Sequence, residues 1–349
     1  MPSADLLTAI DADGHIWERP AEVLKYLGGR WKGRNTPIWP GCQPWDSSLG
    51  DTIGHPYDYR GNLSASDQVK LWHRILDENE IEQAILFPTG SGNVGKLQEP
   101  DFAIAASMAV NEHFAADYAG DRLKPMGVLP MRNPQAAAEE LRRAATKLKL
   151  IGFEILTSGL PFALGDTFYD PVYQAAEELG VTLCVHGTRH WAHEFGAGIL
   201  STFSEVHTYA FPAGILLHFV SVIGKGVPIR FPRLRIAFME VGATWLPYYL
   251  DRIDEHWMKR GHVDMPLLKE TPTQIFCKSN IKVSIEADET LLPETIRAVG
   301  VEHLVFASDV PHWDCEFPEN LHHLRRHEGL STLQKQQILY GNAKQLFNL

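Results

Sequence analysis

Short apolar segments recur along the chain, and stretches with helical periodicity separate them. The apolar segments are nearly continuous rather than alternating, which is typical of parallel strands that are buried on both faces. In the stretches between them, apolar residues recur three or four positions apart, as they do in helices that cover a sheet. The pattern predicts strands at residues 10–16, 83–88, 125–130, 151–156, 181–186, 235–240, 281–285 and 303–309.

The alternation of strands and helices predicts the fold class. Eight strand–helix units in 349 residues indicate an α/β protein with a (β/α)8 TIM barrel. An open doubly wound sheet is the alternative, and the lack of a Gly-x-Gly-x-x-Gly motif after an early strand disfavours it. No low-complexity linker or internal repeat divides the sequence. We therefore expect one domain over residues 1–349.

One long segment, residues 17–64, interrupts the alternation after the first strand. It is rich in Gly, Pro and Trp and includes Trp17, Trp31, Trp39 and Trp45. Loops of this length in compact domains are usually functional or disordered. Because disordered segments contain few aromatic residues, we interpret the segment as a lid-like insertion over a pocket.

The composition narrows the class of partner. The net charge is −11 and the Lys and Arg residues form no long run, which argues against nucleic acid and anionic membranes. The first residues lack the basic start and apolar core of a signal peptide, and the longest apolar run, residues 211–223, is too short to span a membrane. The four cysteines show no Cys-x-x-Cys spacing, so neither a disulfide framework nor a zinc ribbon is indicated. We expect a cytoplasmic protein that acts on a small molecule.

Residues that can bind a metal stand at the ends of several predicted strands. Asp13 and His15 share one face of the first strand, because side chains alternate along a strand. His186, Glu240 and Asp309 end three later strands. A single acid or histidine at such a position is commonly a helix cap or a satisfied polar group. In a TIM barrel, however, active-site residues lie at the carboxyl ends of the strands, so their coincidence predicts a shared metal site.

Over nearly its whole length the sequence resembles the amidohydrolase-related metal enzymes, in the branch of aminocarboxymuconate-semialdehyde decarboxylase and the aromatic-acid decarboxylases. The most specific motif is Ser-Asp-x-Pro-His, within residues 306–312. Weaker matches lie at residues 10–16, 184–187, 230–236, 245–247, 252–254 and 342–343.

The resemblance implies a ligand set for one divalent metal, completed by a water or hydroxide: Asp13, His15, His186 and Asp309. Two positions depart from the better-known members. Asp13 replaces a His or Glu, and Glu240 replaces a His after the sixth strand on which the decarboxylase mechanism depends. The second departure disfavours decarboxylation.

Hydrolysis is therefore the function that we expect first. Zn²⁺ is the first expectation for the metal, since it lowers the pKa of its bound water to about 7. Mixed carboxylate and imidazole ligands also suit Mn or Fe. The hydroxide would attack a carbonyl of a small carboxylated or aromatic-derived substrate and break a C–N, C–O or C–C bond. Proton transfer would fall to Asp309, with Glu240 or His218.

Three alternatives remain open. The first is a non-oxidative decarboxylase of the same superfamily. The second is a dinuclear iron oxygenase, in which Glu240, His207 and His218 would hold a second metal, giving one or two ions in all. The third is a metal-stabilised binding subunit without catalytic activity. The resemblance also implies a homo-oligomer. Substrate binding is assigned to Arg189, His190, His312, Trp313 and Trp17.

Overall fold

The structure is a computed structural model, and it describes residues 7–33, 63–188 and 192–349. Its strands are all paired in parallel and form two sheets with the orders β1-β2-β3 and β4-β5-β6-β7-β8-β9. The strands are β1 (Ala9–Ile16), β2 (Ile81–Pro88), β3 (Leu123–Pro125), β4 (Gly127–Val128), β5 (Gly152–Leu156), β6 (Thr182–His186), β7 (Arg235–Met239), β8 (Asn280–Ile285) and β9 (Leu304–Phe306).

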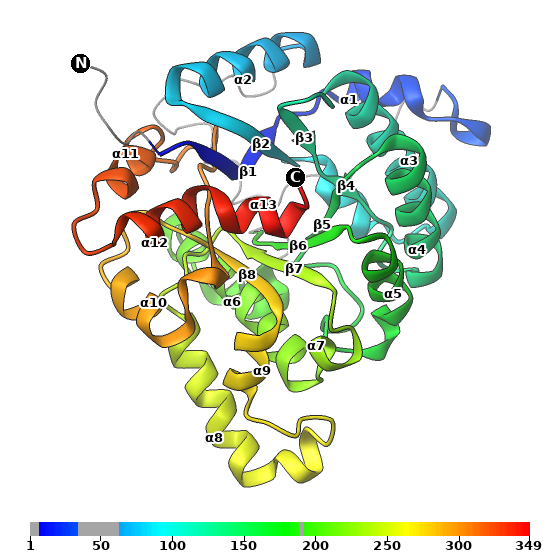
Figure 1. The fold of residues 1–349 in the computed structure, drawn as a ribbon. Helices are drawn as coiled ribbons and strands as arrows, with labels where there is room; N and C mark the ends of the chain where they lie inside the picture. Colours follow the sequence, from blue (N-terminus) through cyan, green and yellow to red (C-terminus); the bar gives the residue numbers. More distant parts are fainter. Residues whose placement is uncertain (1–6, 34–62, 189–191) are drawn as a thin grey trace, which may run out of the picture.

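The two sheets form one ring of strands. Only Met126 separates β3 from β4, and its N–H donates to the carbonyl of Leu86 in β2 at 2.8 Å. At the other seam the N–H of Asp309 donates to the carbonyl of Asp13 at 2.8 Å, and the N–H of His15 donates to the carbonyl of Val310 at 2.7 Å. The predicted strands are therefore confirmed, with the third divided into β3 and β4, and the fold is a TIM barrel (Figure 1).

Helices surround the ring on its outer side, except that α13 crosses one end of it (Figure 1). In chain order they are α1 (Pro20–Val23), α2 (Ala65–Asn79), α3 (Pro100–Asp117), α4 (Pro134–Arg143), α5 (Asp170–Leu179), α6 (Phe203–Gly224), α7 (Val227–Arg230), α8 (Leu246–Asp264), α9 (Pro272–Lys278), α10 (Leu292–Val299), α11 (Glu319–Arg326), α12 (Thr332–Gln336) and α13 (Asn342–Phe347). Most of the predicted insertion, residues 34–62, lies outside the described residues.

The barrel interior is filled by a small apolar cluster that closes one end. Side chains from β1, β2, β6, β7 and β9 meet there with Met126, and α13 covers them with Ala343, Leu346 and Phe347. The hydroxyl of Thr182 in β6 donates to the carbonyl of Leu346 at 2.6 Å, which fixes α13 to this end. The amino-terminal ends of the strands are thus plugged, and polar groups can gather only at the opposite end.

Helix α6 is longer than the apolar run in the sequence indicates. By length and composition alone its 22 residues could cross a membrane, and 44% of its most apolar window is buried in the structure. Its buried side chains include Ile215, Phe219 and Val222, which belong to the main core between helices and strands. We therefore interpret α6 as a covering helix of the barrel.

Candidate metal centre

Strand β1 brings two candidate ligands into the barrel. Asp13 and His15 are buried, with exposed fractions of 0% and 1%. Gly14 between them faces the other way, against the indole ring of Trp72, where the Cζ2 atom would lie 2.7 Å from an added Cβ. The indole N–H of Trp72 also donates to the carbonyl of His15 at 3.2 Å. Helix α2 thus fixes the end of β1 and leaves no space for a side chain at Gly14.

His186 at the end of β6 completes a first group with these two residues. Its Nε2 atom lies 3.4 Å from Oδ1 of Asp13, and Nε2 of His15 lies 3.3 Å from the same oxygen. The three side chains are buried and offer ligand atoms within 4.8 Å of one another. One carboxylate therefore lies between two imidazole nitrogens.

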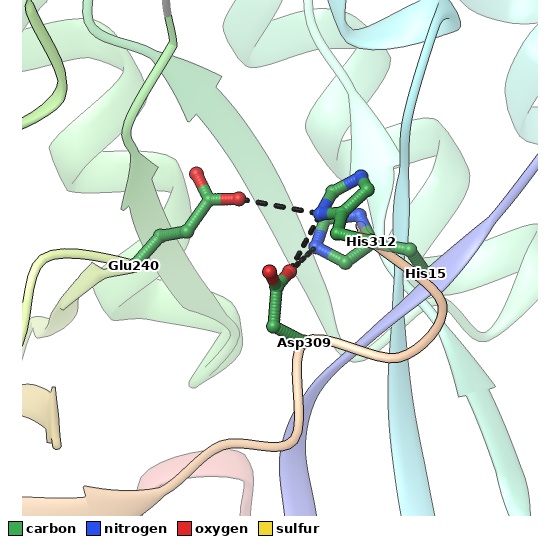
Figure 2. A group of neighbouring side chains, drawn as sticks. All are labelled: His15, Glu240, Asp309 and His312. Atoms are coloured by element: carbon green, nitrogen blue, oxygen red, sulfur yellow. Dashed lines mark hydrogen bonds and ion pairs between the residues drawn. The ribbon is translucent and has the colours of Figure 1, made fainter. Parts of the chain in front are cut away.

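A second, overlapping group consists of His15, Glu240, Asp309 and His312 (Figure 2). Asp309 Oδ1 lies 3.1 Å from Nε2 of His15 and 2.6 Å from Nδ1 of His312. Glu240 Oε1 lies 3.4 Å from the same nitrogen of His312. His15 belongs to both groups, so the two groups form one centre.

The backbone at two of these residues is in the left-handed region. Glu240 has a φ of 73° and Asp309 a φ of 56°, which non-glycine residues adopt uncommonly. Such conformations cost about 1–3 kcal/mol each and cluster at functional sites. The N–H of Glu240 donates to the hydroxyl of Ser284 at 2.8 Å, and the N–H of Asp309 donates to the backbone carbonyl of Asp13. These bonds hold both acids in the orientation that faces the centre.

The donor atoms fit a divalent metal ion. Both carboxylate oxygens of Asp13 and Nε2 of His186 are buried and make no hydrogen bond of good geometry with any described residue, although Asp13 Oδ1 lies at ion-pair distance from His15 and His186. Buried polar atoms that lack a hydrogen bond cost about 1–3 kcal/mol, and more when charged. Carboxylate oxygen and imidazole nitrogen are common ligands of Zn, Mn and Fe. A cation bound among these atoms would satisfy them.

The charges within the centre also favour a bound cation. Burial opposes the charged form of His186, but the carboxylates of Glu240 and Asp13 outweigh it and raise the pKa of His186 well above 6.5. Burial also opposes ionisation of Asp13, but His186 and His15 lower the pKa of Asp13. Because metal ligation requires neutral imidazole, a bound cation would replace the imidazole protons as the partner of these carboxylates.

Aromatic side chains border the centre. A Cβ added to Gly187 would lie 2.7 Å from the ring of Phe211 in α6 and 3.2 Å from Glu240 Oε2, so this ring and this carboxylate both lie close to Gly187. Phe211 packs against His207 at a ring distance of 4.4 Å, and His207 packs against Trp313 at 5.5 Å. We call Phe203, His207, Phe211 and Trp313 the aromatic wall.

His218 and His207, which the sequence assigned to the site, lie outside the two groups of ligand atoms. His218 is not in the centre, because both ring nitrogens bind backbone groups. Its Nδ1 accepts from the N–H of Leu164 at 3.1 Å, and Nε2 lies 2.7 Å from the carbonyl of Thr157. Burial lowers the pKa of His218 to about 4, and the bond to Thr157 opposes this only in part. His218 thus has no lone pair left for a metal, and its assignments as a second-metal ligand and as a proton-transfer residue are corrected.

His207 is also outside the two groups of ligand atoms found among the described residues. Its Nε2 lies 3.8 Å from Asp314 Oδ2, and its ring belongs to the aromatic wall. The structure therefore favours a place for His207 in the aromatic wall over a place as a second-metal ligand. Trp17 lies 6.2 Å from the ring of His312. Arg189 and His190 fall outside the described residues.

Two acids near the centre were missed in the sequence. Asp11 in β1 is fully buried, and Glu154 in β5 has an exposed fraction of 3%. Burial raises the pKa of Glu154 to about 8, against the opposing charges of His186 and His15. An acid inside an otherwise apolar strand is the signal that could have identified each of them.

Comparisons with known proteins find similar decarboxylases. Gamma-resorcylate decarboxylase of Rhodococcus jostii is 26% identical over an alignment of 334 positions, and the match covers 86% of this chain and 95% of that protein. The 2-amino-3-carboxymuconate-6-semialdehyde decarboxylase of Dictyostelium discoideum is 24% identical over 284 residues, which are 80% of this chain and 76% of that protein.

Solved structures share the fold. An amidohydrolase of Mycobacterium avium subsp. paratuberculosis aligns with a TM-score of 0.78 at 20% identity and covers 99% of this chain and 100% of its own. The 5-carboxyvanillate decarboxylase of Novosphingobium aromaticivorans, solved with manganese and a nitrobenzoic acid, aligns with a TM-score of 0.73 at 21% identity. It covers 99% of this chain and 98% of its own. The amidohydrolase profile Amidohydro_2 matches residues 10–349, and the chain is therefore an enzyme of the amidohydrolase superfamily that belongs to the Amidohydro_2 family.

Proposed function

We propose that the chain is a metal-dependent, non-oxidative decarboxylase of a small aromatic carboxylic acid. The observation that carries the proposal is the position of His312, whose Nδ1 lies 3.4 Å from Glu240 Oε1 and 2.6 Å from Asp309 Oδ1. The lack of a His after the sixth strand had favoured hydrolysis. His312 supplies an imidazole beside Glu240, the residue that stands in the place of that His. The objection to decarboxylation therefore no longer applies, and the decarboxylases among the relatives support the same choice.

The ligand set that we propose is Asp13, His15, His186 and Asp309. A divalent cation bound there would act as a Lewis acid toward oxygens of the substrate and so favour electron flow away from the breaking bond. Zn²⁺ and Mn²⁺ both suit these donors, and the manganese in the carboxyvanillate decarboxylase makes Mn²⁺ the first metal to test.

The reaction breaks the bond between a ring carbon and the carboxylate carbon. The electron pair stays on the ring carbon, carbon dioxide leaves, and the ring carbon takes a proton. We assign this proton to the pair Glu240 and His312, which can hold it between a carboxylate and an imidazole at hydrogen-bond range. Glu240 also contacts Nδ1 of His186 at 3.2 Å and so orients that ligand.

The aromatic wall supports an aromatic substrate. Offset or edge-to-face contacts between rings contribute about 0.5–1.5 kcal/mol beyond the area they bury. Phe211 lies directly beside Gly187, the neighbour of the ligand His186. A ring stacked there would have its carboxylate close to the centre. Trp17, whose ring lies 6.2 Å from the ring of His312, would help to exclude water. We also propose a homo-oligomer, as the resemblance implies.

The experiment that tests the function is a substrate screen with the metal-loaded full chain. The panel comprises dihydroxybenzoates and carboxylated vanillates, with aromatic amides and lactones as hydrolysis substrates, each assayed with Mn²⁺ and with Zn²⁺. We expect release of carbon dioxide and, in D2O, one deuterium at the ring carbon that lost its carboxylate. Hydrolysis of an amide or lactone without any decarboxylation would overturn the proposal.

A further inference from the structure

The seam between β1 and the segment after β9 is held by a buried carboxylate that lies outside both groups of metal-binding atoms. Asp11 Oδ1 accepts the N–H of Ser308 at 3.0 Å and the N–H of Asp13 at 3.2 Å. Its Oδ2 accepts the hydroxyl of Ser308 at 2.5 Å. Asp11 has an exposed fraction of 0% and Ser308 of 1%. The hydrogen bonds of Asp11 therefore join β1 to the segment after β9.

Ser308 extends this contact into the turn that carries Asp309. Its hydroxyl oxygen also accepts the N–H of Val310 at 3.1 Å. One residue that flanks Asp309 thus carries the hydroxyl and the other donates to it, and Asp309 itself has a positive φ of 56°. A residue in this region persists when its surroundings over-determine the conformation, and Ser308 supplies two of the bonds that do so.

The same seam carries metal-binding residues on both sides. Asp13 and His15 stand on β1, Asp309 stands on the opposite segment, and Nε2 of His15 lies 3.1 Å from Oδ1 of Asp309. The register of β1 against β2 is irregular between Asp11 and Gly14, so pairing with β2 does not fix this part of β1 by a regular ladder. The bonds across the seam set the separation of these ligands.

We propose that Asp11 and Ser308 act as positioning residues that set the distance between Asp13 and Asp309 for a divalent cation. This role rests on the metal centre of the proposed function. Asp11 and Ser308 would touch neither the cation nor the substrate. Positioning partners of metal ligands typically change metal affinity by about 10–100-fold when they are replaced.

The test compares two variants at the seam with a matched control. Ser308→Ala removes the hydroxyl, and Asp11→Asn keeps the shape of the side chain while replacing one carboxyl oxygen with an amide nitrogen. Thr182→Val removes another buried hydroxyl bond of the barrel, the 2.6 Å bond to Leu346 at the plugged end. Each full-length protein is titrated with Mn²⁺ against a chelator, and the electron paramagnetic resonance spectrum of bound Mn²⁺ reports the symmetry of its ligands.

We expect about 10–100-fold weaker Mn²⁺ binding and an altered spectrum for Ser308→Ala, with a similar or smaller effect for Asp11→Asn. Thr182→Val should lower the thermal midpoint of the metal-free protein while it keeps the affinity and the spectrum of the unsubstituted chain. Wild-type affinity and spectrum in both seam variants would overturn the role of Asp11 and Ser308 and leave the proposed function standing. A wild-type chain that binds neither Mn²⁺ nor Zn²⁺ would overturn both.

Discussion

Nδ1 of His186 lies 3.2 Å from Oε2 of Glu240, while Nε2 of the same ring faces Oδ1 of Asp13 at 3.4 Å. The carbonyl of Gly187 lies 3.1 Å from Nδ1 as well. Two acceptors at Nδ1 favour the tautomer that carries its proton there, which leaves the lone pair of Nε2 free for a metal. Carboxylates that bind metal-ligating histidines in this way fix the ring and raise its basicity. Glu240 thus places a carboxylate against the proposed ligand His186.

Replacement of a proposed ligand should remove the metal without unfolding the barrel. His186→Ala and Asp13→Ala each delete a donor from the buried group, so we expect metal affinity to fall at least tenfold, which is about 1.4 kcal/mol. Metal per chain after dialysis against a metal buffer, together with circular dichroism, measures both effects. His218→Gln is the matched control, because His218 is equally buried but binds only backbone groups. A fully loaded His186→Ala variant would sink the ligand assignment.

Glu240→Gln should separate chemistry from metal binding. Glutamine keeps the size of the side chain and an oxygen that can face His186 but loses the charge that faces His186 and His312. General acid–base groups contribute about 10²–10⁴ in rate, whereas a second-sphere partner changes affinity by about 10–100-fold. We therefore expect kcat to fall by at least about 100-fold when the enzyme is assayed at saturating metal. His312→Gln should give a loss of the same order, and unchanged kcat in both variants would exclude the pair from proton transfer.

The aromatic wall should determine how tightly the substrate ring binds. Phe211→Leu keeps an apolar side chain beside Gly187 but removes the ring face, so KM for an aromatic carboxylate should rise by about three- to tenfold, since a ring contact contributes about 0.5–1.5 kcal/mol. Metal affinity should stay unchanged. Phe162→Leu is the control, because Phe162 is half exposed and packs against Phe168 outside the wall. An unchanged KM in the Phe211 variant would contradict stacking.

The sequence was most informative where a residue's place follows from its strand. The apolar runs predicted the barrel, and position at a strand end brought Asp13, His186 and Asp309 together. This works because all parallel strands of a barrel present their carboxyl ends at one face. A contact within one turn, such as His312 with Asp309, also lies within reach of such reasoning, although the sequence alone assigned His312 only to the substrate.

Residues on helices and inside strands were harder to place. The rotation of α6 about its own axis directs His218 toward Thr157 and Leu164 instead of the centre, and neither charge nor spacing in the sequence fixes that rotation. Asp11 and Glu154 were overlooked because a single acid does not change the apolar pattern of a strand. Their partners come from segments far along the chain, as Ser308 does for Asp11, and only the folded chain brings them together.

Glu154→Gln should stabilise the metal-free protein, by an amount that depends on pH. Both carboxyl oxygens of Glu154 are buried and make no hydrogen bond with any described residue. Burial raises its pKa from 4.5 to about 8. Between these values the native state binds more protons than the unfolded state, so the contribution of Glu154 to stability is complete below pH 4.5 and is lost as pH rises toward 8. Glutamine has no proton to lose and removes this dependence.

The free energy of unfolding of Glu154→Gln should therefore match that of the unsubstituted chain near pH 4.5 and exceed it by about 3 kcal/mol at pH 7, since each pKa unit corresponds to about 1.4 kcal/mol. Urea unfolding with a chelator present, at several pH values, measures the difference. Glu139→Gln, on the exposed face of α4, should show no such growth with pH. A constant difference across this range would mean that Glu154 is ionised in the native state and has a partner such as a buried water. A difference that grows would identify Glu154 as a neutral acid, kept beside the metal-binding histidines at a cost in stability.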